Sequence, residues 1–426
     1  MEKIKKAVAF LLSALLVGGL SACSMGGGSD SSSSDSTPIE SSSSSSSSST
    51  PEEPEPPQES SSSIVEEEEE EKEIPEYLET KADKAGRVTL KKTSDVPADF
   101  VLDVEGDDEI KILQITDTQM IDPLQLRKGY SAISDRYLDH DKCIYDIVTQ
   151  VVEATQPDLI LLTGDYVYGD YDDNGTLFRE QTDYFDSLGI FWAPIFGNHD
   201  NDSDSLYSTW VDPEYPDWYP RKQCRYFENS EYCLFRTRTQ ISGYSNYSLA
   251  IEQNGELVRS VFMMDTKGSM GTAQDLTDAQ IAWFEEGVAA INEHAGKTIP
   301  NFVGIHVPIR AFADAAAQYN FVSGTKMEIP ENDNGDQGFL TSGIATKCDN
   351  DYSAFNSFKA NNTDAILAGH LHMNNASILY QGIRFVFGTK SSTYDKYDAS
   401  LLGGTLFTLG ENNSFDVDIV YYDANK

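Results

Sequence analysis

The chain has 426 residues, a formal net charge of −39 at pH 7 and a charged fraction of 24%. This acidity argues against binding to a nucleic-acid backbone, because phosphate groups attract basic surfaces. None of its five cysteines forms a Cys-x-x-Cys pair, which argues against a zinc site made of thiolates.

The first 75 residues predict a targeting segment followed by a linker. Residues 1–23 combine early lysines with an apolar stretch that is short for a membrane span. This stretch ends in Leu20-Ser21-Ala22-Cys23, which resembles the lipobox of bacterial lipoproteins. We therefore expect lipidation of Cys23, a membrane anchor and an extracytoplasmic location; the alternative is an ordinary secretory signal. Residues 24–75 are rich in Ser, Pro and Glu, and they predict a disordered tether because they have little apolar surface to bury.

Residues 76–426 predict one α/β domain with insertions near 201–255 and 311–349, because strand-like runs alternate with helical patterns. Helices are expected at 141–156, 176–187 and 277–294, the last with a capping box formed by Thr277 and Gln280. Strands are expected at 110–116, 159–165, 191–196, 260–265, 302–306, 376–380, 383–387, 405–409 and 415–422. The last four strands are expected to be antiparallel and to close a second sheet.

Two cysteines of the first insertion leave an alternative open. Cys224 and Cys233 are compatible with a disulfide in an exported protein, and equally with two buried or free thiols.

Polar side chains follow several predicted strands at the point where each strand ends. These groups are Asp117, Asp165, Gly197-Asn198-His199-Asp200, His306 and Gly369-His370-Leu371-His372, and they contain four of the six histidines. Loops at one edge of a layered sheet structure can bring such groups together, so the pattern predicts a single polar site. Carboxylates, imidazoles and an amide without thiolates suit Mn, Fe or Zn.

In this order, the motifs resemble those of the calcineurin-like metallophosphoesterases over about residues 110–390. The resemblance is nearest to phosphatases that share a His-x-Pro element, here at 306–308, and a Gly-His-x-His ending. It implies a four-layer αββα sandwich with a dinuclear metal centre. Asp165 would bridge two ions; one would be completed by Asn198, His306 and His370, and the other by Asp117 and His372.

The same resemblance implies hydrolysis of a phosphoester by a metal-bound hydroxide. His199 would stabilise the developing charge or protonate the leaving oxygen, and Asp200 would orient it. Arg310 is a candidate for holding a phosphate oxygen of the substrate, although an ordinary surface charge is the alternative. Lys390 is expected to be a surface charge, and Asp265 a packing residue.

The chain departs from the family pattern at its first motif, which reads Asp117-Thr118-Gln119 where Asp-x-His is usual. An amide oxygen is a poorer ligand than an imidazole, so Gln119 either binds weakly or is replaced by another ligand. Tyr168 is the candidate replacement, because its spacing from Asp165 resembles the tyrosinate ligand of ferric iron in purple acid phosphatases. Simple packing of the aromatic ring is the alternative.

Three functions are therefore compatible with the sequence. The first is a metal-dependent phosphoesterase at the cell surface, and the second is a phosphodiesterase or nucleotidase of the same fold. The third is a non-catalytic surface binding protein that has lost the histidine of its first motif. Retention of the other ligand residues favours an enzyme. The two histidines outside the motifs, His140 and His294, are expected at the surface.

Overall fold

The computed structural model describes residues 86–91, 96–121, 139–169, 175–201, 220–238, 240–268, 274–343 and 352–426. All of these residues belong to one compact unit, Glu69–Lys426. Cys23, the predicted signal peptide and the predicted tether lie outside the described residues. Within the described ranges, no helix combines the length and apolar character that crossing a membrane requires.

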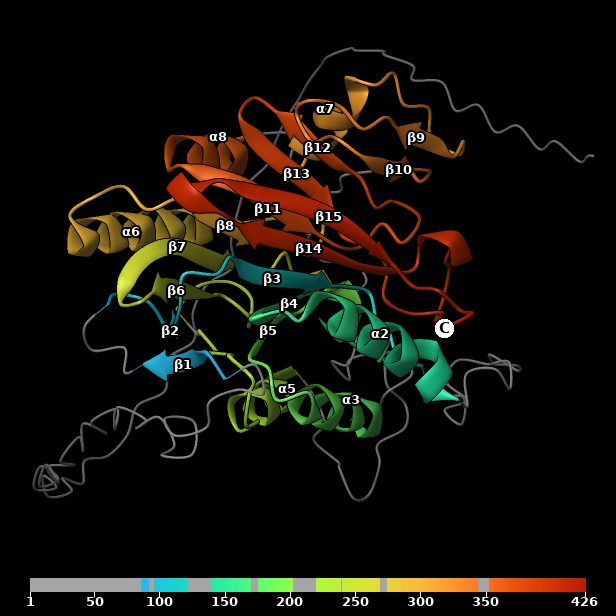
Figure 1. Cartoon of the computed structure of the whole chain (residues 1–426), viewed down its shortest axis with the longest axis horizontal. Helices are drawn as coiled ribbons and strands as arrows, with labels where there is room; N and C mark the ends of the chain where they lie inside the picture. Colours follow the sequence, from blue (N-terminus) through green and yellow to red (C-terminus); the bar gives the residue numbers. More distant parts are fainter. Residues whose placement is uncertain are drawn as a thin grey trace, which may run out of the picture. The chain divides into compact units, whose positions relative to one another are not determined.

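Two mixed β-sheets form the centre of the fold (Figure 1). The five-stranded sheet consists, in spatial order, of β15 (Phe415–Tyr421), β14 (Gly403–Leu409), β3 (Ile110–Ile115), β4 (Leu159–Thr163) and β5 (Trp192–Ile195). The eight-stranded sheet consists of β1 (Val88–Lys91), β2 (Phe100–Val104), β6 (Tyr247–Gln253), β7 (Glu256–Met263), β8 (Asn301–Gly304), β11 (Thr363–Ala368), β13 (Ile383–Phe387) and β12 (Ser377–Tyr380). The sheets contact each other through residues such as Phe302 and Phe407, whose ring centroids are 5.4 Å apart.

Each sheet has a group of neighbouring strands that run parallel. In the smaller sheet these are β3, β4 and β5, and in the larger sheet they are β7, β8, β11 and β13. Every residue of β4 is buried, as expected for a parallel strand that is covered on both faces. Parallel strands place their carboxyl ends at the same edge of a sheet, so the loops that follow each parallel group are gathered together.

Helices cover the outer face of each sheet, which completes four layers (Figure 1). The smaller sheet is covered by α2 (Asp146–Thr155), α3 (Thr176–Ser187) and α5 (Pro220–Glu228), and the larger sheet by α6 (Asp278–Ala295), α7 (Ala311–Ala317) and α8 (Ser353–Ala360). Neighbouring residues of β11 alternate between the two hydrophobic cores: Leu367 packs between the sheets, and Ile366 packs under the helices. The predicted αββα sandwich is therefore confirmed.

Several local predictions are confirmed as well. A π-helical turn, η4 (Asp141–Tyr145), leads into α2 within the predicted helix. The capping box of α6 is present, since the Thr277 side chain accepts from the Gln280 backbone N–H, and the Gln280 side chain accepts from that of Thr277. Gly296 ends the helix in a left-handed conformation with φ of 63°.

The prediction that the last four strands close one sheet is wrong. β12 and β13 join the eight-stranded sheet, while β14 and β15 join the five-stranded one. The expected antiparallel pairing does hold between β12 and β13 and between β14 and β15, but β13 also pairs with β11 in parallel. Alternation along a strand shows that it is a strand, but the partner is chosen by contacts with distant parts of the chain.

The two predicted insertions are shorter than expected. The first extends to Gly255 in the prediction, yet β6 is a core strand that pairs with β2 and β7. In the second, α7 packs on β12, and β9 (Met327–Ile329) pairs with β10 (Gly338–Leu340) in a separate two-stranded sheet.

The open question about the thiols is resolved against a disulfide. Cys224 and Cys233 are both free and buried. Burial raises the pKa of the Cys224 thiol to about 12, as expected for a structural thiol.

Candidate metal centre

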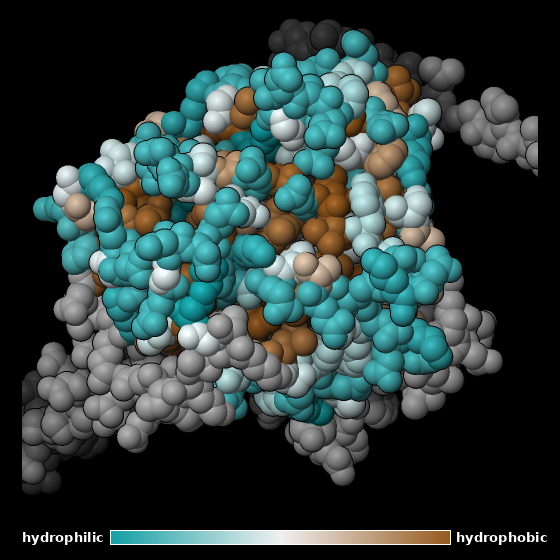
Figure 2. All heavy atoms as spheres, in the orientation of Figure 1, coloured by the Kyte–Doolittle hydropathy of each residue, from teal (hydrophilic) through white to brown (hydrophobic). Residues whose placement is uncertain are grey.

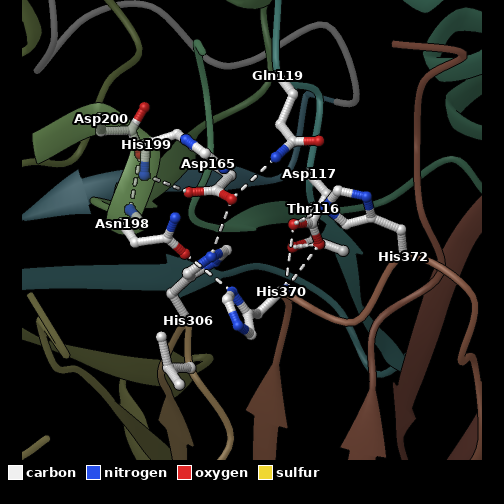
Figure 3. Close-up of polar contacts among 12 residues, drawn as sticks. Thr116, Asp117, Gln119, Asp165, Asn198, His199, Asp200, His306, His370 and His372 are labelled. Atoms are coloured by element: carbon white, nitrogen blue, oxygen red, sulfur yellow. Dashed lines mark hydrogen bonds and ion pairs between the residues drawn. The ribbon is translucent and has the colours of Figure 1, made fainter. Parts of the chain in front are cut away.

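The polar groups predicted from the strand ends meet in space (Figure 3). Asp117 follows β3, Asp165 follows β4, and the short helix α4 (Asn198–Asn201) follows β5. From the other sheet, His306 follows β8, while His370 and His372 follow β11. The site thus forms where the carboxyl edges of the two groups of parallel strands face each other.

Ligand atoms gather in two clusters that share Asp165. One cluster contains Asp165, His306 and His370, the other Asp117, Asp165 and His372. Within each cluster, one ligand atom per residue lies within 4.8 Å of the others. Asn198 adds its side-chain oxygen to the first cluster, since Oδ1 lies 2.8 Å from Nδ1 of His370. The structure therefore brings together all six residues predicted to bind metal.

Hydrogen bonds fix the orientation of the imidazole rings. Nδ1 of His306 donates to the Thr163 carbonyl at 2.8 Å, which leaves its Nε2 facing Asp165. In the same way, Nδ1 of His372 donates to the carbonyl of Lys396 at 3.0 Å, and its Nε2 lies 3.4 Å from Asp117 Oδ1. Partners of this kind set which ring nitrogen is free to bind a metal.

The carboxylates and imidazoles shift each other's pKa values. Burial acts to raise the pKa of Asp165, but the charges of His306 and His199 hold it well below its ordinary value. Burial acts to lower the pKa of His306, but the charge and hydrogen-bonding contact of Asp165, together with the charge of Asp117, raise it to about 9. Burial, followed by the charge of His306, lowers the pKa of His370 to about 4. Burial acts to raise the pKa of Asp117, and its interaction with His372 lowers it overall.

The residues fit a pair of metal ions. Nε2 of His306 is fully buried and lies 3.1 Å from Asp165 Oδ2, yet it makes no hydrogen bond. A buried nitrogen without a hydrogen bond is costly, and a cation that it shares with the carboxylate would satisfy it. The donor set of carboxylates, imidazoles and one amide oxygen is typical of Mn, Fe and Zn sites.

Two glycines allow the loops to approach each other. A Cβ atom at Gly197 would lie 2.2 Å from Oδ1 and 2.3 Å from the backbone nitrogen of Asp165. A Cβ at Gly369 would lie 2.3 Å from Thr116 Oγ1 and 2.9 Å from Asp117 Oδ2. Any side chain at these positions would displace a carboxylate of the metal centre.

His199 and Asp200 have different kinds of partners. The backbone N–H of His199 donates to Asp165 Oδ1 at 2.9 Å, and its ring stacks on Tyr168 with centroids 3.9 Å apart. Asp200 accepts the backbone N–H groups of Tyr166, Val167 and Gly197 at 2.6–3.0 Å. Burial, and then the charge of Asp165, raise the pKa of Asp200 to about 7. Asp200 therefore positions the loop that carries His199, and orientation of the His199 ring by Asp200 stays a prediction.

The expectation that Lys390 is a surface charge is wrong. Its side chain is buried, and its Nζ donates to the Asp117 carbonyl at 2.8 Å and to Gln119 Oε1 at 2.9 Å. Burial lowers the pKa of Lys390 to about 8, against the opposing effect of the Asp117 charge. The sequence does contain a signal for it, because Lys390 follows the strand-like run of β13 as the other site residues follow theirs.

The remaining candidates lie outside the ligand clusters. Arg310 is exposed, with its guanidinium 5.9 Å from the centroid of the Tyr352 ring. Asp265 is buried and accepts the backbone N–H groups of Tyr244, Ser245 and Lys267, which confirms its packing role. His294 is exposed as expected, and His140 is half-buried beside Glu180.

Known proteins resemble this chain in sequence. The model of the family described as calcineurin-like phosphoesterase matches residues 110–374, which is more than half of the chain. Phosphatase DCR2 of Saccharomyces cerevisiae is 32% identical over 101 residues, which cover 22% of this chain and 16% of that protein. The match therefore spans much less than two-thirds of this relative's length.

Solved structures also align with the chain. A dimetal phosphatase from Danio rerio aligns with a TM-score of 0.43 and 10% identity, and the alignment covers 74% of this chain and 100% of that one. The purple acid phosphatase PPD1 from seeds of yellow lupin (Lupinus luteus) aligns with a TM-score of 0.42 and 11% identity, over 75% of this chain and 53% of that one.

Replacing the shared carboxylate is expected to weaken both metal sites. Asp165→Asn should lower the affinity for both ions by at least about 100-fold, because even partners of metal ligands contribute tenfold or more. Elemental analysis after dialysis against a fixed Mn²⁺ concentration measures the effect. Asp416→Asn, on the exposed side of β15, is the matched control. Parent-like metal content in Asp165→Asn would contradict the shared site.

Proposed function

The chain belongs to the calcineurin-like phosphoesterase family, and on that premise we propose that it hydrolyses phosphoester bonds with two metal ions. The observation that carries the proposal is the pair of ligand clusters that share Asp165. Together with Asp165, one ion would be coordinated by Asn198, His306 and His370, and the other by Asp117 and His372. When bound, two such ions supply a hydroxide nucleophile near neutral pH and neutralise charge on the phosphoryl oxygens.

His199 is the residue best placed to act on the substrate. Its backbone N–H donates to Asp165, and the residue is only partly buried beside the metal centre. From this position the imidazole would hold a phosphoryl oxygen in the transition state or protonate the leaving oxygen. Asp200 contributes by bracing the loop through three backbone N–H groups.

The convergence of all six predicted ligand residues supports an enzyme over a non-catalytic surface binding protein. The position of the missing first-motif histidine is occupied by Gln119, which donates to Asp165 Oδ2 at 3.0 Å. Figure 2 shows hydrophilic residues around an apolar area on one face, and the chain is strongly acidic. An anionic phosphoester approaching such a surface depends on a local positive charge, which the metal ions would provide.

His199→Ala is expected to keep both ions and to lose most turnover, by about 100-fold or more in kcat, since general acid–base groups contribute 10²–10⁴-fold. Hydrolysis of p-nitrophenyl phosphate and bis(p-nitrophenyl) phosphate by the metal-loaded protein measures this effect and separates monoester from diester cleavage. His294→Ala is the matched control, because His294 is exposed on α6. Equal rates for His199→Ala and the parent would contradict a catalytic role for His199.

Tyr168 is expected to act through the stacking of its ring on His199. Tyr168→Phe preserves the ring and should keep most activity and the full metal content. Tyr168→Leu removes the ring and should lower kcat by about fivefold, because stacked rings contribute about 1 kcal/mol. A different outcome for Tyr168→Phe would contradict this role. If that variant loses one metal ion together with visible absorption, Tyr168 is a tyrosinate ligand to iron.

We also propose that the protein is extracytoplasmic and attached to a cell membrane through a lipid on Cys23. The supporting features are the apolar start, the lipobox-like sequence ending at Cys23, and the Ser-, Pro- and Glu-rich residues 24–75. Cys23→Ser should move the protein from the membrane to the soluble fraction of the host cell, while Ser29→Ala should not. Retention of Cys23→Ser in the membrane fraction would argue against the lipid anchor.

A further inference from the structure

Lys390 is fixed behind the metal centre by backbone pairing on two sides. It forms a parallel bridge with Thr116, at the end of β3, and its carbonyl accepts the N–H of Gly403 at 3.0 Å. The next residue, Ser391, donates its N–H to the Thr116 carbonyl at 3.1 Å. Because the backbone is held in this way, the ammonium group is delivered to one place in the interior.

The contacts of the ammonium determine how the Gln119 amide points. Lysine has no acceptor, so the atom that it contacts at 2.9 Å must be the amide oxygen. The amide nitrogen then faces the other way and donates to Asp165 Oδ2 at 3.0 Å. Gln119 is completely buried, so water does not compete for its oxygen. The orientation of this amide therefore follows from hydrogen-bonding chemistry.

This orientation makes the two metal sites unequal. The first has Asp165, His306 and His370 together with the oxygen of Asn198. The second has Asp117, Asp165 and His372, and the neighbouring amide oxygen that could serve as a further ligand is bound by Lys390. A cation in the second site therefore has fewer ligands for as long as Lys390 keeps that oxygen.

We propose that Lys390 withholds the Gln119 oxygen from the cation held by Asp117, Asp165 and His372, which makes this site the weaker of the two. The proposal rests on the dinuclear centre of the proposed function. It assigns Lys390 the part of a positioning residue, since it acts on the metal site through Gln119. The second ion then exchanges with the free metal pool, so occupancy of the complete centre follows the concentration of that metal.

The test is a titration of the metal-free full-length chain with Mn²⁺, with free Mn²⁺ followed by electron paramagnetic resonance and no substrate present. The parent should bind one ion tightly and one weakly. Lys390→Met frees the amide, while the Asp117 carbonyl keeps the hydroxyl of Ser392 as a donor at 3.0 Å. We expect the weak site to tighten at least about tenfold, within the range that such neighbours contribute, and the tight site to change little.

A double variant shows whether Lys390 affects the second metal site through Gln119. Lys390→Met combined with Gln119→Ala should lose the gain, because no amide oxygen remains to bind the cation. Lys359→Met, at an exposed position on α8, is the matched control and should behave as the parent. If Lys390→Met does not fold, as judged by loss of the tight site, Lys390→Gln replaces it.

Two results would overturn the inference: an unchanged or weakened second site in Lys390→Met, or the full gain in the double variant. A parent that binds two ions but cleaves no phosphoester would contradict the proposed function and not this inference, because the titration measures binding alone. A parent that binds no ion would overturn both.

Discussion

The buried carboxylate of Asp165 is the point on which the site depends. Its Oδ1 accepts the backbone N–H of His199, and its Oδ2 faces Gln119 Nε2 and His306 Nε2 at 3.0 and 3.1 Å. These partners come from the ends of three other strands, in both sheets. An ionised carboxylate that is buried without partners would be strongly unfavourable, so the loops must converge for it to be tolerated.

The backbone around this carboxylate is held in an uncommon conformation. Asp117, Gln119, Asp165 and His370 have φ values of 53°, 44°, 52° and 71°, in the left-handed region that side chains disfavour. Such strain persists only where surrounding structure enforces it, and it is typical of functional sites. Here the parallel strands enforce it, because each strand must turn sharply at its carboxyl end to direct a ligand inward.

Charge balance within the site is adjusted by groups that bind no metal. Lys390 supplies a buried positive charge beside Asp117. The Gln119 amide connects Lys390 to Asp165, because its oxygen accepts from Lys390 and its nitrogen donates to Asp165. Asp200 joins two loops by accepting three backbone N–H groups. The ligand residues thus define which chemistry is available, whereas these neighbours determine the geometry and affinity with which the ligands act.

The sequence by itself determined the features that depend on neighbours along the chain. The strand ends that carry Asp117, Asp165, His306 and His370 were predictable, because alternation and apolar runs are local signals. The capping box of α6 was predictable for the same reason, since Thr277 and Gln280 meet within one helical turn. The four-layer architecture followed from the resemblance that these motifs carry.

The tertiary structure alone decided what depends on distant contacts. β12 and β13 were recognisable as strands, but their sheet was selected by pairing with β11 and not with β14. The position of Lys390 after a strand is visible in the sequence, but only the folded chain shows that it is buried against Asp117 and Gln119. Local periodicity reports which face of a segment is apolar. The burial of Lys390 depends on residues 271 and 273 positions away, and the choice of a strand partner depends on how the two sheets assemble.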